Sequence, residues 1–273
     1  MKAIFGFFVL AGLLAGPLDL SYYLPGYAVV EGSLKGKSGY VFLLDTGAER
    51  TIVDAKLAKN LGLKEVPTSS PNKVATPSGG SVKVGLVATD SFGFESLADG
   101  RPALVMDLTE AKKLIGGPID MIIGFDVLRS MGSKLRIDYK NRRVSMEEHA
   151  ADWGQVVKFE GTKFPIVDAV ANGRPVRLLL DTGSHDVILF GDNYDFGILA
   201  TEISAIGNSD GRSVSTQKAL LDIKMGEAVF KLKTVSLMPK QTRYAVAVDG
   251  ILGTGAFGAV ELDFLAKEIR IAN

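Results

Sequence analysis

The chain has 273 residues, of which 47% are hydrophobic, with 31 basic and 31 acidic residues. This content is enough to bury one or two cores, and a formal net charge of zero gives no electrostatic basis for binding nucleic-acid phosphates. The absence of cysteine excludes disulfides and thiol nucleophiles, and only His149 and His185 are available as histidine ligands. We therefore expect no metal, no cofactor and no nucleic-acid partner.

The first 20 residues have the pattern of an export segment. Lys2 precedes an uncharged apolar stretch from Ala3 to Leu18, which is the arrangement of a secretory signal. Pro17 interrupts this stretch, and it is shorter than the roughly 20 residues that a membrane-spanning helix needs. A signal peptide, an uncleaved membrane anchor and a buried core element therefore remain open for residues 1–20. The pattern predicts an exported chain, periplasmic or secreted, with a membrane tether as one form of it.

Strand-like segments follow. The runs 27–34 and 40–44 are rich in β-forming residues, and Gly36 between them supplies a hairpin turn. The second run leads directly into Asp45-Thr46-Gly47, and a β pattern resumes at 51–53. These segments predict a hairpin whose second strand ends at an aspartate.

Helix signals are few. Over 54–61, Asp54 can cap the N-terminus, Leu57 and Leu61 share a face, and Gly62 ends the pattern. Weaker helix patterns occur at 108–115 and 126–130. Short strands are predicted at 122–124 and 137–139.

The second part of the chain repeats this order. Its turn is Asn172-Gly173, and residues 192–197 predict a loop where the first part has a helix. The predicted strands of the second part are 164–171, 176–180, 187–190, 251–253 and 262–264.

Two motifs occur twice, in the same order and at nearly the same offset. Asp45-Thr46-Gly47 recurs as Asp181-Thr182-Gly183, and the block 120–124 recurs as 249–253, each with an aspartate first and a glycine last. Such self-similarity indicates a duplicated half. A polar stretch at 147–155 marks the joint, so we predict a first half at 21–150 and a second half at 151–273.

A twofold arrangement of the halves would place Asp45 and Asp181 side by side. Two carboxylates at that distance cannot both ionise readily, so the pair shares one proton and titrates as a unit. The charged member can accept a proton from water while the neutral member donates one to a carbonyl. This pattern is suited to peptide hydrolysis without a metal or a covalent intermediate.

These residues resemble the pepsin and retropepsin superfamily of aspartic proteases, over about residues 27–272. The resemblance is to two tandem retropepsin-like halves of bacterial type, and it implies an all-β, bilobal fold of two β-barrel-like halves. It implies that Asp45 and Asp181 are the catalytic pair and that Thr46 and Thr182 brace the two loops. It also implies that Gly47 and Gly183 line a substrate cleft between the lobes.

Family members cover the cleft with flaps. The best candidate here contains Ser78, Gly79 and Gly80, with 207–211 as a partner segment in the second half. No tyrosine occurs between Val66 and Met106, so the flap tyrosine of pepsins has no counterpart. We expect these flap residues to contact the substrate.

Ionisable groups follow each Asp-Thr-Gly loop: Glu49 and Arg50 in the first half, His185 and Asp186 in the second. We expect them to influence the pH at which the aspartate pair works, in a direction that the sequence leaves open.

Together these features predict a monomeric aspartic endopeptidase that hydrolyses an extended polypeptide with water activated between Asp45 and Asp181. The alternative is a module of the same fold that binds peptides without cleaving them.

Overall fold

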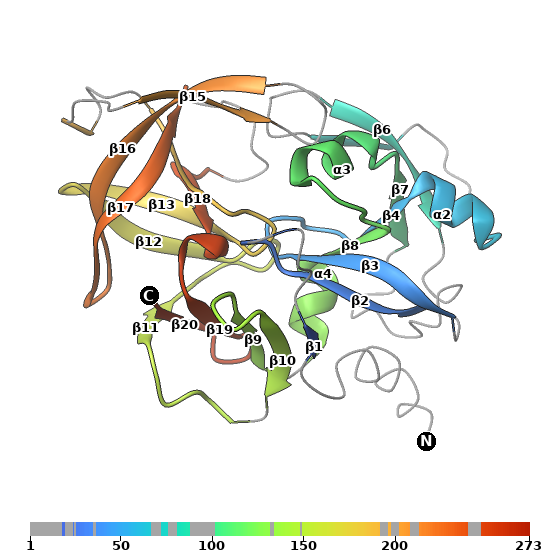
Figure 1. Cartoon of the computed structure of the whole chain (residues 1–273), viewed down its shortest axis with the longest axis horizontal. Coiled ribbons are helices and arrows are strands. Elements are labelled where there is room, and N and C mark those ends of the chain that lie inside the picture. The colour runs from blue at the N-terminus through green and yellow to red at the C-terminus, as the bar shows by residue number, and fades with distance from the viewer. Residues whose placement is uncertain are drawn as a thin grey trace.

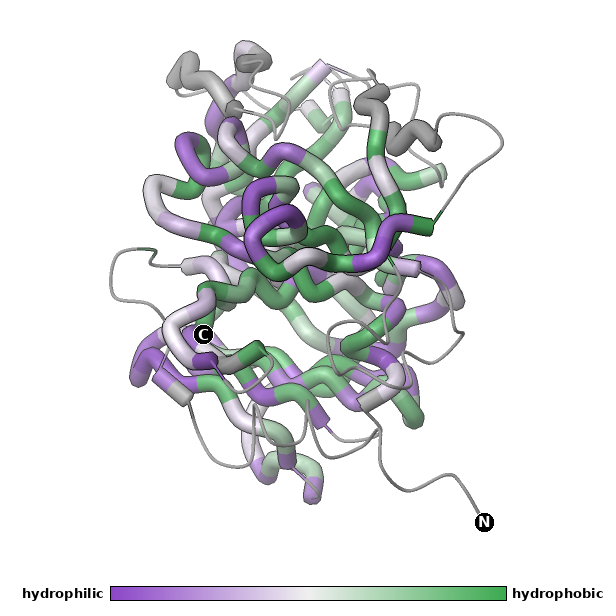
Figure 2. The backbone as a smooth tube through the Cα atoms, turned by 90° about the vertical axis from the view of Figure 1, so that its right-hand side faces the viewer, coloured by the Kyte–Doolittle hydropathy of each residue, from purple (hydrophilic) through white to green (hydrophobic). Residues whose placement is uncertain are grey.

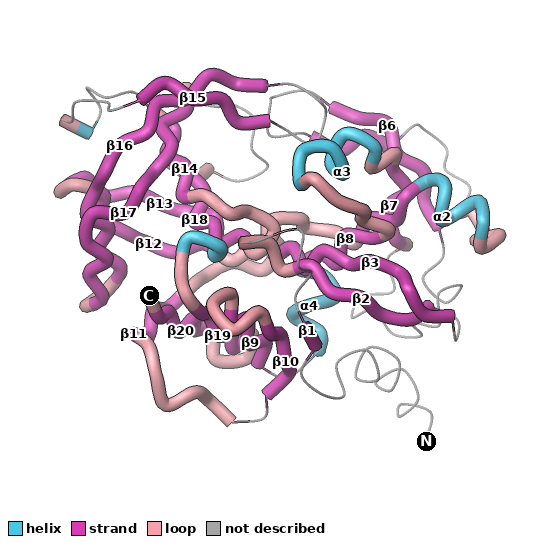
Figure 3. The backbone as a smooth tube through the Cα atoms, viewed as in Figure 1, coloured by secondary structure: helices cyan, strands magenta, loops and turns pink. Residues whose placement is uncertain are grey.

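The computed structural model describes residues 18–19, 24, 26–34, 37–66, 72–75, 81–87, 102–131, 134–147, 149–191, 196–197, 202–207, 213–239 and 247–273. Strands dominate these residues, and the helices among them are short (Figure 3). They form three sheets, two of seven strands and one of six (Figure 1). The predicted all-β, bilobal fold is confirmed.

The first seven-stranded sheet belongs to the first half of the chain. It begins with the antiparallel pair β2–β3, and β3 runs parallel to β8. Across the sheet the strands are β2 (Val29–Leu34), β3 (Lys37–Asp45), β8 (Met121–Gly124), β4 (Ile52–Asp54), β7 (Ala103–Met106), β6 (Ser81–Val87) and β5 (Asn72–Ala75).

The second seven-stranded sheet has the same design. Its strands, again in spatial order, are β12 (Ile166–Ala171), β13 (Arg174–Asp181), β18 (Gly250–Gly253), β14 (Val187–Phe190), β17 (Ala228–Met238), β16 (Ser213–Met225) and β15 (Glu202–Gly207). Each strand stands where its counterpart stands in the first sheet, and β13 runs parallel to β18 as β3 does to β8. The repeat seen in two short motifs therefore extends to the strand order of a whole sheet.

Local signals explain the turns and helices. Asn172 and Gly173 both have positive φ, 47° and 84°, as a two-residue hairpin between β12 and β13 requires. Helix α2 (Ala55–Asn60) is capped by Asp54, whose side chain accepts the N–H groups of Lys56 and Leu57. The helix predicted at 54–61 is confirmed.

The weaker helix patterns are also helical. The pattern at 108–115 is α3 (Thr109–Ile115), which ends at Gly116 with a φ of 83°. The pattern at 126–130 is α4 (Phe125–Leu128), continued by the 3-10 turn η2 (Arg129–Met131). Of the loop predicted at 192–197, only Phe196 and Gly197 are described.

The six-stranded sheet joins the halves and lies below the other two sheets in Figure 1. Its order is symmetric about the antiparallel pair β9–β19, with three strands on each side: two from the first half and β1 from the segment before it, and three from the second half. The strands are β1 (Leu18–Asp19), β10 (Arg143–Glu147), β9 (Lys134–Asp138), β19 (Ala259–Asp263), β20 (Glu268–Ala272) and β11 (Gln155–Lys158).

Strand β1 brings the end of the segment 1–20 into this sheet, because Leu18 pairs with Val144 and Asp19 with Arg143. The rest of that segment lies outside the described residues. Among the residues that the structure does describe, no helix is long and apolar enough to cross a membrane.

The apolar core runs through both halves. Hydrophobic residues concentrate along the inner strands and hydrophilic residues at many of the outer turns (Figure 2). One buried cluster includes Phe42 from β3, Leu178 from β13, and Leu135 and Leu262 from the joining sheet. The halves are therefore packed on a shared core as well as hydrogen-bonded.

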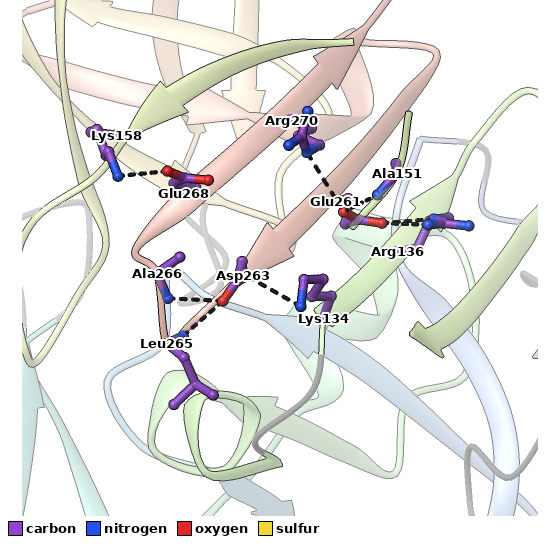
Figure 4. Close-up of polar contacts among 10 residues, drawn as sticks. All are labelled: Lys134, Arg136, Ala151, Lys158, Glu261, Asp263, Leu265, Ala266, Glu268 and Arg270. Atoms are coloured by element: carbon purple, nitrogen blue, oxygen red, sulfur yellow. Dashed lines mark hydrogen bonds and ion pairs between the residues drawn. The ribbon is translucent and has the colours of Figure 1, made fainter. Parts of the chain in front are cut away.

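A buried ion pair lies at the centre of the joining sheet (Figure 4). Arg136 and Glu261 are directly opposite in the β9–β19 register. The Glu261 carboxylate is almost fully buried and accepts the Arg136 Nε and Nη2 hydrogens at 2.9 and 2.5 Å and the Ala151 N–H at 2.8 Å. A buried charge is tolerated when it is paired and hydrogen-bonded in this way.

We expect Glu261→Leu to lower the free energy of unfolding by about 3 kcal/mol, because Arg136 and Arg270 both lose the buried carboxylate that they face. Arg136 then keeps Glu147, at 3.5 Å. Arg136→Leu combined with Glu261→Leu should recover part of that loss, since the side chains then left without these partners, Arg270 and Glu147, are partly exposed. Urea unfolding measures both.

The control is Lys158→Ala, which breaks the exposed Lys158–Glu268 pair at the edge of the same sheet. It should change stability by less than about 1 kcal/mol. Equal losses for Glu261→Leu and Lys158→Ala would contradict a special role for the buried pair.

Candidate active site

Each predicted catalytic aspartate is the last residue of a buried strand. Asp45 ends β3 beside Gly124 of β8, and Asp181 ends β13 beside Gly253 of β18. The leucines that precede the aspartates in both strands are buried. The repeated blocks therefore supply the neighbouring parallel strand for each aspartate.

The aspartate that begins each repeated block holds the neighbouring strand, β8 or β18, in place beside the strand of the catalytic aspartate. A side-chain oxygen of Asp120 accepts the Val41 N–H at 2.9 Å, and Asp249 accepts the Arg177 N–H at the same distance. In return their own N–H groups donate to the carbonyls of Val41 and Arg177. These hydrogen-bonding roles of Asp120 and Asp249 were not predicted from the sequence, although the occurrence of an aspartate at the same place in both repeated blocks pointed to a shared role.

The fold brings the carboxyl groups of Asp45 and Asp181 within hydrogen-bonding reach of each other. A Cβ atom at Gly47 would lie 2.5 Å from Cγ of Asp181, and one at Gly183 would lie 2.6 Å from Cγ of Asp45. Any side chain at either glycine would therefore collide with the opposite carboxyl group. These glycines permit the close approach of the two loops.

The two threonines bind each loop to the other by four hydrogen bonds. The Thr46 N–H donates to Thr182 Oγ1 at 3.0 Å, and the Thr182 N–H donates to Thr46 Oγ1 at 3.1 Å. Thr46 Oγ1 donates to the Leu180 carbonyl at 2.8 Å, and Thr182 Oγ1 donates to the Leu44 carbonyl at 2.6 Å. Both threonines are fully buried, so this exchange also satisfies backbone groups that water cannot reach.

Backbone N–H groups surround the carboxyl pair. Ala48 N–H donates to Asp45 Oδ1 at 3.0 Å, and Gly183 N–H donates to Asp181 Oδ1 at 2.8 Å. The Gly47 N–H is within hydrogen-bonding reach of both carboxyl groups. These donors favour one negative charge on the pair.

The pair retains a proton to higher pH than an ordinary aspartate. Burial raises the pKa of Asp45, against the hydrogen bonds from Asp181 and the backbone. Burial and then the charge and hydrogen bond of Asp45 raise the pKa of Asp181 well above its ordinary value of 3.8. The two carboxyl groups therefore share one proton and titrate as a unit.

Different ionisable groups flank the two loops. After the second loop, His185 Nδ1 is 3.0 Å from Asp186 Oδ1, and this hydrogen bond raises the pKa of His185. After the first loop, Glu49 is 3.5 Å from Lys163 of the second half.

Arg50 lies 3.9 Å from the buried carboxylate of Asp126, which also accepts the Thr51 N–H and hydroxyl. Burial raises the pKa of Asp126. Asp126 has no acidic counterpart in the second half, where Gly255 occupies the matching place.

The predicted flap residues Ser78, Gly79 and Gly80 lie outside the described residues. They connect β5 and β6, which pair as an antiparallel hairpin, and the segment 208–212 connects β15 and β16 in the same way. Among the described parts of the chain, no group of three or more His, Asp or Glu residues could hold a metal ion.

A family model described as aspartyl protease matches residues 30–127. The match includes Asp45 and ends before Asp181. It supports a place in the aspartic protease superfamily and, in general terms, an aspartic peptidase activity. A search of curated proteins finds no match for the chain.

We expect Thr182→Ala to lower the free energy of unfolding by about 3 kcal/mol, because the Thr46 N–H and the Leu44 carbonyl would both lose buried partners. Thr182→Ser keeps the hydroxyl and should lose less than half as much. Urea unfolding distinguishes them, and equal losses would mean that the methyl group matters more than the hydrogen bonds.

Asp181→Asn should stabilise the chain at pH 7 and lose this advantage near pH 4. Between pH 3.8 and the raised pKa of Asp181, the pair holds a proton in the folded wild type that the unfolded chain releases. The wild type therefore loses stability as pH rises through this range, whereas the variant lacks this carboxyl group. Thermal unfolding from pH 3.5 to 7.5 measures the effect.

Asp54→Asn is the control of opposite sign. Burial opposes the charge of Asp54, but the hydrogen bond from Lys112 and those from the α2 backbone outweigh it and lower its pKa. This variant should therefore be less stable than the wild type at neutral pH, and this deficit should shrink as pH falls toward and below 3.8. The same pH trend in both variants would contradict the raised pKa of the pair.

Proposed function

We propose that the chain is an aspartic endopeptidase in which Asp45 and Asp181 form the catalytic pair. The observation that carries this proposal is the close approach of two carboxyl groups that come from matching loops of the two halves. A scaffold has no physical need for two acids in contact, because the second ionisation is strongly opposed. The family match over 30–127 supports the same chemistry in general terms.

A pair that shares one proton suits the two roles that hydrolysis requires. The charged member, Asp45 in this proposal, removes a proton from water as the water oxygen attacks the peptide carbonyl carbon. Asp181 gives its proton to the carbonyl oxygen, and a neutral tetrahedral diol forms. When the diol collapses, Asp45 gives its proton to the leaving nitrogen as the C–N bond breaks, and Asp181 takes a proton from one diol hydroxyl, so the pair again shares one proton.

The reaction needs one neutral and one charged carboxyl group at the same time. Because the pKa of Asp181 is raised well above 3.8, this state extends from acidic pH toward neutrality. The rate should therefore fall on both sides of the range in which the pair holds a single proton.

The substrate in this proposal is an extended polypeptide held between the two lobes, with Ser78, Gly79 and Gly80 over it. We also propose that the halves 21–150 and 151–273 are two tandem retropepsin-like units. Their matching strand orders and the symmetric joining sheet support this division. One chain then supplies both aspartates, so a monomer suffices, and the N-terminal pattern supports export.

We expect Asp45→Asn and Asp181→Asn each to reduce cleavage of a denatured protein substrate by at least about a thousandfold, because each removes one of two obligatory roles. Both variants should fold, since asparagine keeps the shape of the side chain. Mass spectrometry of digests between pH 3 and 7 detects the cuts.

A statine-type inhibitor and a mixture of the two variants serve as controls. The inhibitor should suppress cleavage by the wild type. The mixture should stay inactive, because each chain builds its own site. Near-wild-type cleavage by either variant would contradict the catalytic pair, and absence of cleavage by the wild type would favour a peptide-binding module.

A further inference from the structure

The two halves differ in chemistry at one pair of matching contacts close to the catalytic strands. Tyr139 follows β9 in the first half, and Phe264 follows β19 in the second half at the corresponding place. Thr254 follows Gly253, and Phe125 follows Gly124, again at corresponding places. Tyr139 contacts Thr254 of the second half, and Phe264 contacts Phe125 of the first half. Of Tyr139 and Phe264, only Tyr139 carries a hydroxyl.

Tyr139 is bound to the second half by two hydrogen bonds, and its neighbour Lys140 adds a third. Its hydroxyl is 2.6 Å from Thr254 Oγ1. Its N–H donates to the Gly258 carbonyl at 2.9 Å, and the N–H of Lys140 donates to the same carbonyl at 3.1 Å. Thr254 is fully buried, so the Tyr139 hydroxyl satisfies a group that solvent cannot reach.

The matching contact in the other direction is apolar. The Phe125 and Phe264 rings meet edge to face with their centroids 5.9 Å apart. Such a contact constrains the position of a side chain less strictly than a short hydrogen bond does. The contact between Tyr139 and Thr254 is therefore a directional hydrogen bond, whereas the matching contact between Phe264 and Phe125 is not.

This link is attached next to Asp181. Thr254 begins the 3-10 turn η3 (Thr254–Ala256) directly after Gly253, which is the parallel partner of Asp181. The Tyr139 hydroxyl lies within the electrostatic field of the site, because burial and then the charge of Asp181 raise the pKa of Tyr139. A shift of Thr254 would thus be transmitted to the strand that supports Asp181.

We propose that Tyr139 is a positioning residue whose hydroxyl, through Thr254, holds Asp181 in hydrogen-bonding contact with Asp45. The inference builds on the proposed function, but the contact between the carboxyl groups can be measured whether or not the chain cleaves peptides.

The coupling between two carboxyl groups depends steeply on their separation, because a shared proton requires a short hydrogen bond. If the link is lost, the two groups move apart and titrate more independently. The upper apparent pKa of the pair then falls and the lower one rises.

The test is Tyr139→Phe in the full chain, which removes one hydroxyl and keeps the ring. Aspartate labelled with 13C at the carboxyl carbon reports the titration of the pair by NMR, and Asp45→Asn and Asp181→Asn assign the signals. We expect the two apparent pKa values to approach each other by about one unit. Where turnover is measurable, kcat should fall about tenfold with KM unchanged, because geometry is lost at the reacting groups alone.

Thr254→Val is the matched variant, since it removes the partner hydroxyl and keeps the shape. It should reproduce the change in titration, and the double variant should show no further change, because both substitutions break one interaction. Leu57→Ala in α2 is the stability control. It creates a cavity remote from the site, so it should lower the melting temperature and leave both pKa values of the pair unchanged.

A purely structural role for Tyr139 predicts a lower melting temperature with an unchanged separation of the two pKa values, and this result would overturn the inference. Additive changes in the double variant would overturn it as well. If the aspartates of the wild type titrate as a coupled pair but the chain cleaves no peptide, the proposed function is rejected. The titration of the Tyr139→Phe variant then decides the positioning role of Tyr139 by itself.

Discussion

Two carboxyl groups in contact repel each other once both are charged, and much of this molecule serves to hold them there. The cost is reduced because the pair shares one proton and accepts several backbone N–H groups. The remaining repulsion must be resisted by the loops, which Thr46 and Thr182 join through four buried hydrogen bonds. Gly47 and Gly183 are small for the same reason, since each faces the opposite carboxyl group.

The wider fold supports this contact by near-symmetry. Two seven-stranded sheets with matching strand orders deliver the two loops, and a joining sheet with three strands on each side of its centre sets their distance. The side chains at matching positions differ where the two halves meet. Arg136 faces Glu261 at directly opposite positions, and the Tyr139–Thr254 hydrogen bond stands opposite the Phe125–Phe264 ring contact. Matching positions of the two halves therefore carry unlike side chains at their interface.

Most of the fold was predictable because the signals were local. The cap at Asp54 and the Asn172-Gly173 turn act within a few residues, and the strands beside the aspartates were visible as repeated apolar blocks. The partners of Asp120 and Asp249 were missed, because each lies more than 70 residues away along the chain. The buried role of Glu261 was missed for the same reason, since an isolated glutamate in a strand gives no sign that an arginine from the other half covers it.

The sequence by itself determined the all-β class, the repetition of two motifs and the two Asp-Thr-Gly loops as the candidate site, because composition, periodicity and repetition can be read along one dimension. Only the tertiary structure decided that the two loops touch, that burial raises the pKa of both aspartates, and that Tyr139 reaches the residue after the strand beside Asp181. Contact, burial and charge coupling depend on distances between segments that the chain brings together only when it folds.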